Sequence, residues 1–431
     1  MVARKLNKMI AEHPTLLRNK GGGSRPLLVI LDRNADLITP FQHASTYQAL
    51  IDDLLTHKAN RVEFVVTQDA GGKRPKQIPK KFDLDPDEDP FYNAHKFQPF
   101  PEAIESNGVE LQEVKTREQE VRSKAVGGGG ETSIMPDPMA NAANDLATAV
   151  DSLPALLDQK KQLEMHTSIL QAVMNEVAAR DVPQFYELES SLATGSYKND
   201  LGQAKKDVIA LAGDPSKGNV EDKIRLVMVF CLATAAKSAD IDEVTQAMQK
   251  GVESMEGVDR VAREKVQVGI KAVQYLKQLR SMHMIPSMAD MMTTEVDSSA
   301  GAGLSSFMAK ATTQATGFLA KATDRVSSLL GKIHKHHATR VVENLCEMKP
   351  GTEDEDFLYL DPKVKGEVDV AKLRTMTRSP VREVITFMIG GGCYAEYQNL
   401  QMVATDRRSV SYGSTELIDA SQFLAQLGQL G

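Results

Sequence analysis

Apolar residues in the middle of the chain recur every three or four positions, which is the spacing of one buried face of an α-helix. The pattern runs from residue 101 to residue 285 and is interrupted by the glycine run Gly127–Gly130 and by pairs such as Asp214-Pro215, which are typical of turns. The middle of the chain is therefore predicted to be helical, over Glu102–Ala125, Asn141–Arg180, Gln184–Leu192, Ala204–Ala212, Val220–Ala236, Ile241–Lys250 and Asp259–Leu279.

The two ends of the sequence have a different pattern. Continuous apolar runs predict strands covered on both faces, as in a parallel sheet, and helical segments alternate with them. The strands are expected at Pro26–Leu31, Val384–Ile389 and Val410–Tyr412, and the helices at Thr46–Leu55, Tyr394–Ala404 and Ser421–Leu430. The predicted fold class is α/β plus all-α: part of a parallel sheet domain, interrupted by a large helical insertion domain. Three strands are fewer than the usual four to six or so, so we expect further strands outside this sequence.

These changes of pattern predict three parts of the chain. Residues 1–45 are expected to form the end of the first half of the α/β domain and residues 346–431 its second half. Residues 46–345 are expected to form the helical domain. Within the helical domain we expect a hairpin at about residues 100–180 and a loop with an amphipathic helix at about residues 288–332. Gly71–Pro90, rich in glycine, proline and lysine and then in acids, is expected to be a loop.

The segment Asn141–Arg180 has an apolar stripe of coiled-coil type. Pro154 lies inside it, and an interior proline removes a backbone hydrogen bond, so we expect a kink or a break there, at a cost of about 3 kcal/mol. One hypothesis is that the stripe offers a groove to a partner helix; the alternative is that it is buried in its own domain. The candidate groove residues are Leu153, Pro154, Leu157, Leu163, His166, Leu170 and Met174.

A second amphipathic helix is predicted at Leu304–Leu330. Its polar face is made of Ser, Thr and Gly, which are poor helix formers, so the helix is marginal unless its apolar face is covered. A bilayer surface can cover such a face, and so can the protein itself. The candidate membrane-contacting residues are Leu304, Phe307, Met308, Phe318, Leu319, Val326 and Leu330.

Composition narrows the class of protein. The net charge is −7, which argues against a general nucleic-acid binder. The three cysteines, Cys231, Cys346 and Cys393, are sparse and odd in number, which indicates a reducing compartment without a disulfide framework. The sequence has neither a signal peptide nor an apolar run of about 18 residues, so we expect a cytosolic protein with at most peripheral membrane contact.

Several short motifs invite a chemical interpretation. The strand–glycine–helix turn at Gly390–Gly392 is followed by no lysine and fits no phosphate-binding motif. Asp32 and Asp36 are four residues apart, and we expect Asp32 and Arg33 to stabilise a turn by hydrogen bonds. The acids from Asp83 to Asp89 lack the glycine and the distal glutamate of an EF-hand, so a solvated loop is expected. We expect no catalytic residue, metal or cofactor.

The histidines His334, His336 and His337 stand among lysines, with no carboxylate or cysteine beside them. Three histidines close together invite a metal-site interpretation. A histidine near a helix C-terminus is favourable without any metal, because the helix dipole favours positive charge there. We therefore expect a helix end rather than a metal site.

Several stretches together resemble the SM family of syntaxin-binding, Sec/Munc-like vesicle-fusion proteins. LLVILDRNADLITPFQHASTYQALIDDLL, from Leu27, is similar to a family signature through Asp32, Arg33, Asp36 and the Thr46-Tyr47-Gln48 helix start. Four further stretches resemble later segments of the family: FYNAHKFQPFPEAIES, VDSLPALLDQKKQLEMHTSIL, VITFMIGGGCYAEYQNLQ and SYGSTELIDASQFLAQL. The EYQNL ending and the helix at Leu304–Leu330 point to the Sly branch, which serves ER–Golgi transport.

The resemblance implies an arch-shaped, non-enzymatic regulator of SNARE assembly. In such a protein the helical hairpin around Pro154 templates the zippering of SNARE helices, and the inserted helix is a lid that touches membrane. The implied partners are a Golgi or ER syntaxin and its cognate R-SNARE, bound by a monomer in the cytoplasm and at ER, Golgi and vesicle membranes. The resemblance also implies that the family's N-terminal domain, which captures a syntaxin N-peptide, is not part of this sequence.

Two alternatives remain open from the sequence. One is an SM protein of another trafficking step, vacuolar or endosomal. The other, from a different class of protein, is a nucleotide-binding α/β hydrolase that uses the turn at Gly390–Gly392. The hydrolase would be stabilised by nucleotide, because a ligand that binds only the folded state raises the free energy of unfolding.

Overall fold

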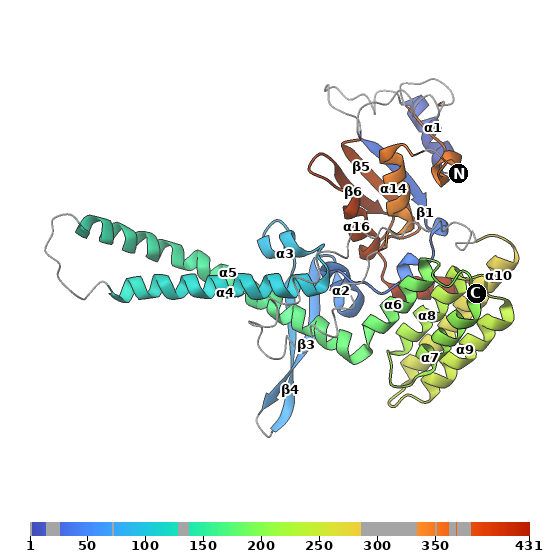
Figure 1. The fold of residues 1–431 in the computed structure, drawn as a ribbon, viewed down its shortest axis with the longest axis horizontal. Coiled ribbons are helices and arrows are strands. Elements are labelled where there is room, and N and C mark those ends of the chain that lie inside the picture. The colour runs from blue at the N-terminus through green and yellow to red at the C-terminus, as the bar shows by residue number, and fades with distance from the viewer. Residues whose placement is uncertain are drawn as a thin grey trace. The chain divides into compact units, whose positions relative to one another are not determined.

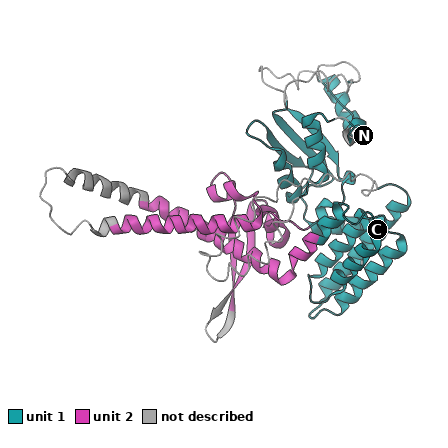
Figure 2. Ribbon diagram, viewed as in Figure 1, with its two compact units in different colours: residues 1–42, 188–294, 333–431 teal, residues 43–187, 295–332 magenta. Residues whose placement is uncertain are grey.

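A computed structural model describes residues 2–13, 26–70, 73–127, 138–285, 334–349, 351–361, 368 and 381–431. Its contacts divide the chain into two compact units, residues 1–42, 188–294 and 333–431 forming unit 1, and residues 43–187 and 295–332 forming unit 2 (Figure 2). The boundaries predicted at residues 45 and 345 follow a different criterion, the change in sequence pattern, and they stay a prediction.

Unit 1 contains a parallel three-stranded sheet assembled from the two ends of the sequence (Figure 1). Its strands are β1 (Leu27–Asp32), β5 (Glu383–Ile389) and β6 (Ser409–Ser414), in the order β1-β5-β6. Leu27 pairs with Val384 and Asp32 with Ile389, so the long insertion lies between two adjacent strands. The helices α14 (His337–Glu347) and α16 (Tyr394–Leu400) contribute to the core that buries the sheet's Val29, Leu31, Val384 and Met388. The predicted α/β class with a helical insertion is confirmed.

The rest of unit 1 is helical. It contains α7 (Leu201–Gly213), α8 (Val220–Ala233), α9 (Ser238–Glu253), α10 (Arg260–Ser281) and the C-terminal α17 (Ala420–Leu430). Helix α8 begins with a capping box, in which Asn219 and Asp222 each bond the other's backbone N–H. Every residue of α8 except Glu221 is buried, so the helix forms the centre of this group of helices. Gly428 brings α17 close to α10, since a side chain there would lie 2.6 Å from the Val268 Cγ1.

Unit 2 combines helices with a small antiparallel sheet. Its elements are α2 (Tyr47–Leu54), β2 (Thr56–Lys58), β3 (Arg61–Ala70), β4 (Lys73–Asp83), α3 (Pro90–His95), α4 (Phe100–Gly127) and α5 (Pro138–Arg180), followed by the start of α6 (Val182–Ala193). The sheet order is β2-β3-β4. The loop predicted at Gly71–Pro90 is therefore wrong over Lys73–Asp83. Pro75 and Pro79 suggested a loop, but β4 is an edge strand, where a missing N–H costs no ladder bond.

The remaining described elements are short: the helix α1 (Val2–Glu12) and the 3₁₀ turns η1 (Arg33–Ala35), η2 (Thr39–Phe41), η5 (Glu353–Asp356) and η6 (Gln401–Val403). The predicted helices of the insertion agree with the structure to within about three residues at each end. Helix α5 continues through Pro154, so the predicted break of the helix at this proline does not occur. Among the described helices, none combines the length and the apolar character that crossing a bilayer requires.

Candidate functional site

Helices α4 and α5 form the hairpin that the sequence predicts, and they run side by side in Figure 1. Polar side chains join the described parts of the two helices at several points. The Asn107 amide donates to the Leu163 carbonyl at 3.0 Å, and the Thr167 hydroxyl donates to the Asn107 Oδ1 at 2.8 Å. Farther out, the Lys160 ammonium lies 2.8 Å from the largely buried Glu118 carboxylate. These bonds set the register of the two helices where apolar contacts alone would allow sliding.

The inner part of α5 is anchored by His166, whose side chain is 0% exposed. Its Nδ1 lies 2.9 Å from the Tyr47 hydroxyl on α2, and its Nε2 lies 2.8 Å from the Asp89 Oδ2. Both ring nitrogens therefore have partners, as a buried imidazole requires. The Tyr92 ring stacks on the imidazole, with centroids 6.1 Å apart. His166 is thus a structural anchor of the hairpin and has no free nitrogen for a ligand.

Asp89 is a site residue that the sequence analysis missed. The sequence pattern places it among solvated acids, but it is buried and caps α3 by accepting from the Tyr92 N–H at 2.8 Å. Burial alone raises the pKa of Asp89, but the hydrogen bond and charge of His166 and the backbone N–H donors together outweigh it, so the pKa is lowered overall. The signal was present in the sequence, because an aspartate directly before Pro90 is a typical helix start.

The predicted groove residues fall into two sets. Leu163, His166, Leu170 and Met174 are buried in unit 2, so in this conformation they are core residues and cannot contact a partner. Leu153 is half-buried, while Pro154 and Leu157 are exposed, Leu157 by 39% of its surface. The stripe is thus continuous in sequence but divided in space, and only Leu153, Pro154 and Leu157 remain as candidates for partner contact.

The other predicted site, the amphipathic helix, lies outside the described residues. All of its candidate residues belong to the part of the chain that the structure leaves undescribed: Leu304, Phe307, Met308, Phe318, Leu319, Val326 and Leu330. Membrane contact through this segment stays a prediction.

The turn after β1 is held by buried charge. The Arg33 guanidinium makes two parallel bonds to the Glu396 carboxylate, at 3.2 and 3.1 Å, and its Nε donates to the Asp36 carbonyl at 2.7 Å. Asp36 accepts from the backbone N–H groups of Ile38 and Thr39. Burial opposes ionisation of Asp36, yet Arg33 and these donors hold its pKa at about 2.

The predicted structural role of Asp32 and Arg33, which is to stabilise this turn by hydrogen bonds, is confirmed. Asp32 accepts from the Asn34 N–H at 2.9 Å and caps the 3₁₀ turn η1. Glu396, which the sequence analysis did not single out, is 0% exposed and also accepts from the Tyr412 hydroxyl. Every strong charge here has a partner, so the arrangement resembles a buried structural ion pair more than a catalytic centre.

The glycine turn Gly390–Gly392 is closed by neighbouring side chains. Gly390 and Gly391 have φ values of 98° and 95°, which favour glycine. A side chain on Gly390 would lie 2.9 Å from the Arg33 Cβ, and one on Gly392 would lie 2.1 Å from the Tyr412 Oη. The N–H groups of Gly390 and Gly391 donate to the Thr415 hydroxyl, and that of Gly392 donates to the Glu416 carbonyl. Because these donors are already used within the protein, the hydrolase alternative loses its main support.

The three histidines lie at the start of α14. His336 is the N-cap and His337 the first helical residue. The histidines therefore lie at the N-terminus of α14, where the helix dipole does not favour positive charge, and the helix end expected before them lies outside the described residues. Burial lowers the pKa of His334 and of His336, so both rings are neutral at pH 7. The described residues contain no group of three His, Cys, Asp or Glu side chains placed to hold a metal ion.

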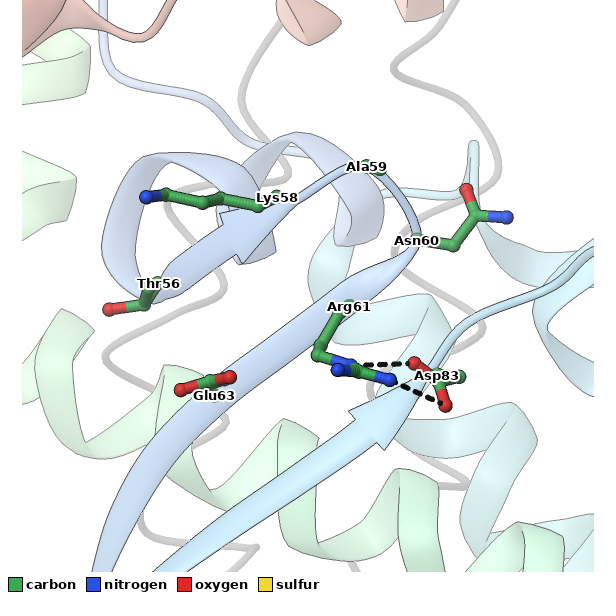
Figure 3. A pocket seen from close by; sticks show the side chains of 7 residues that line it. All are labelled: Thr56, Lys58, Ala59, Asn60, Arg61, Glu63 and Asp83. Atoms are coloured by element: carbon green, nitrogen blue, oxygen red, sulfur yellow. Dashed lines mark hydrogen bonds and ion pairs between the residues drawn. The ribbon is translucent and has the colours of Figure 1, made fainter.

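A surface pocket lies at the turn between β2 and β3 (Figure 3). Its lining is formed by Thr56, Lys58, Ala59, Asn60, Arg61, Glu63 and Asp83. The Arg61 Nε donates to the Asp83 Oδ1 at 2.9 Å, so these two opposite charges neutralise each other. This lining contains no cysteine or histidine that could act as a nucleophile or general base.

Comparison with known proteins assigns this architecture to a family. The Sec1 family model matches residues 1–426. The human "Sec1 family domain-containing protein 1" is 33% identical over 453 residues, and the Drosophila melanogaster "Protein sly1 homolog" is 32% identical over 455 residues. Each match covers 100% of this chain, and the chain spans 66% of the length of each relative.

The fold comparison agrees with the sequence comparison. The crystal structure of Sly1p in complex with an N-terminal peptide of Sed5p superposes with a TM-score of 0.63 at 21% identity, covering 100% of this chain and 62% of that one. The resemblance to the Sly branch, inferred from individual motifs, is confirmed by relatives that carry the Sly1 name. This chain belongs to the Sec1 family.

Proposed function

We propose that this chain is the SNARE-binding part of a regulator of vesicle docking and fusion in ER–Golgi transport. Family membership supports the proposal, together with relatives named for Sly1. The solved Sly1p structure contains a peptide of Sed5p. We further propose that the protein acts as a monomer in the cytoplasm and at membranes of that route, and that it binds a Golgi or ER syntaxin and the cognate R-SNARE rather than performing a chemical reaction.

The observation that carries the proposal is the α4–α5 hairpin with its divided stripe. The inner part of α5 is fixed by core packing and by His166, while the outer part exposes Leu157 beside Pro154. A partner helix binds well to a rigid helix pair that presents apolar anchors at its surface. The outer part of the hairpin, around Leu153, Pro154 and Leu157, is thus the proposed start of the SNARE template.

A titration of purified syntaxin and R-SNARE helices against the chain tests this. The double variant Leu153→Asp, Leu157→Asp is expected to weaken binding at least about tenfold, because it places charge where an apolar face must be buried. The matched control is Val261→Asp on α10, since Val261 is an exposed apolar residue of a helix outside the hairpin, at 60% exposure. A folded chain that binds neither SNARE helix contradicts the proposal.

A second proposed activity is membrane contact through Leu304–Leu330. Its support is the one-sided apolar pattern of that segment with a Ser- and Thr-rich opposite face. The variant Phe307→Asp, Phe318→Asp is expected to abolish binding to small, highly curved liposomes while SNARE titration stays unchanged. Liposome binding that survives both substitutions would remove this part of the proposal.

A further inference from the structure

The antiparallel strands β3 and β4 form a long two-stranded ribbon, visible in Figure 1. The strands have ten and eleven residues, which corresponds to about 30 Å of ribbon. Strand β2 covers the outer edge of β3 only from Arg61 to Glu63. From Phe64 onward, the described part of the chain provides no strand on that side of β3.

The backbone groups of Val65 and Thr67 point to this uncovered edge. The two-residue turn Ala59-Asn60 joins β2 to β3, so Arg61 and Glu63 direct their N–H and C=O groups toward β2. With the strand period of two, Val65 and Thr67 direct theirs the same way. Among the described residues, no backbone group on this side of β3 bonds to Val65 or Thr67. The Val65 side chain is 57% exposed. Within the described part of the chain, the edge therefore presents backbone donors and acceptors that have no protein partner and are in register.

The two outer edges of the ribbon differ in how they are protected. Strand β4 carries Pro75 and Pro79 together with several lysines, which are typical devices against strand addition. The Phe64–Thr67 stretch of β3 reads FVVT, with no proline and no charge, and it consists of strong strand formers. Only one edge of this ribbon is therefore suited to accept another strand.

The charge of the ribbon indicates what kind of strand fits. Residues 61–83 contain six basic residues (Arg61, Lys73, Arg74, Lys76, Lys80 and Lys81) and three acids (Glu63, Asp69 and Asp83), in a chain whose net charge is −7. Glu63 pairs with Lys81 at 2.9 Å, and Asp83 pairs with Arg61. Lys76 and Lys80 have no ion-pair partner among the described residues. The positive excess is thus concentrated on β4, one strand away from the open edge.

We propose that the β3 edge from Phe64 to Thr67 binds an extended, acidic segment of a partner protein as an added strand. Main-chain bonds to Val65 and Thr67 supply the affinity, and acidic side chains on the added strand complement the uncompensated lysines. A second copy of this chain fits poorly, because two edges meeting would bring two positively charged ribbons together. The site lies on β3 rather than on the hairpin helices α4 and α5, so its residues differ from those of the proposed SNARE template.

Hydrogen exchange on the full chain tests the edge itself. The amides of Phe64 and Val66, which face β4, are expected to be protected, and those of Val65 and Thr67 to exchange rapidly. The probe is an acetylated octapeptide with alternating valine and threonine in its middle and glutamates at both ends. Adding it is expected to slow exchange at Val65 and Thr67. Protection of these two amides in the free chain would overturn the proposal.

A labelled form of the same peptide, followed by fluorescence anisotropy, tests the mode of binding. Val65→Pro removes an outward N–H without touching the ladder to β4, and it is expected to weaken binding about tenfold. Val65→Thr keeps the N–H and is the matched control, expected to bind as the original chain does. Equal binding by Val65→Pro, with Phe64 and Val66 still protected, would overturn the proposal.

A charge reversal keeps the proposal testable if the proline variant fails to fold. The double variant Lys76→Glu, Lys80→Glu leaves the β3 backbone intact and is expected to prefer a peptide with lysines in place of the glutamates. The original chain is expected to prefer the acidic peptide. No change in preference would overturn the charge argument. Dimerisation of the original chain that Val65→Pro abolishes, without peptide binding, would show an interface between copies instead and would overturn the proposal.

Discussion

The inner and outer parts of α5 share one apolar periodicity but have opposite surroundings. Leu163, His166 and Leu170 are enclosed by unit 2, whereas Pro154 and Leu157 are exposed, only a few residues earlier. The periodicity of a helix defines which residues share a face, but it does not define what covers that face. In this hairpin the cover changes along the helix, so one stripe provides a core at one end and a candidate binding surface at the other.

The largest expected effect is in the core part of the stripe. Leu170→Ala removes buried methyl groups and leaves a cavity, which is expected to lower the free energy of unfolding by about 2–5 kcal/mol. Denaturant unfolding, followed by helical circular dichroism, measures it. A loss below about 0.5 kcal/mol, the usual range for surface positions, would mean that Leu170 does not belong to a packed core.

The next effect concerns the proline. Pro154→Ala restores a backbone N–H within α5, and alanine is favoured over proline in a helix interior by about 3 kcal/mol. Hydrogen exchange of the amides around residue 154 is expected to slow, by up to about a hundredfold if most of this energy is gained locally. Unchanged exchange would indicate that the outer part of α5 already tolerates the proline without loss, and it would count against the kink expected at Pro154.

A smaller effect, with a pH signature, is expected at His166. His166→Phe keeps a ring but leaves the Tyr47 hydroxyl and the Asp89 carboxylate without their partner, at a cost of about 1–3 kcal/mol at pH 7. The control is Ser168→Ala, two residues farther along α5. It should change the free energy of unfolding by less than about 0.5 kcal/mol.

The pH dependence follows from Asp89, whose pKa is lowered in the folded chain. A group with a lowered pKa stabilises the fold above its ordinary value, about 3.9 for Asp, and this stabilisation is lost as the pH falls through the folded pKa. The difference in stability between the original chain and His166→Phe should therefore shrink below about pH 4. A difference that is constant with pH would mean that His166 acts through packing alone.

The smallest effect is expected at the exposed part of the stripe. Leu157→Ala should change the free energy of unfolding by less than about 0.5 kcal/mol, because the side chain is already largely in water. The same variant should weaken SNARE-helix binding measurably if Leu157 is a contact of the template. A large loss of stability would place Leu157 in the core and would remove the distinction between the two parts of α5.

Much of the fold could be predicted from the sequence, because strong local signals agreed with the tertiary structure. The insertion helices had regular apolar spacing, and the runs before Asp32 and Gly390 identified the parallel strands β1 and β5. The ribbon was missed because Pro75, Pro79 and the Gly71-Gly72 pair are loop signals, and only the position of β4 at a sheet edge makes them compatible with a strand.

The candidate site was only partly predictable for a related reason. Periodicity grouped Leu157 with Leu170, although burial by α2, α3 and α4 depends on residues far away in the sequence. The partners of His166 illustrate this, since Tyr47 and Asp89 are 119 and 77 residues from it. Such pairs leave no local signal, so a single sequence cannot separate the core part of the stripe from the exposed part.

The pairing of β1 with β5 has a consequence for synthesis on the ribosome. About 350 residues separate Asp32 from Glu383, so β1 cannot pair with β5 until the whole insertion between them has been made. At about 5–20 residues per second, the apolar strand waits roughly 18 to 70 s without its partner. During that interval the nascent polypeptide carries an apolar strand without its β5 neighbour, which makes this protein an expected client of co-translational chaperones.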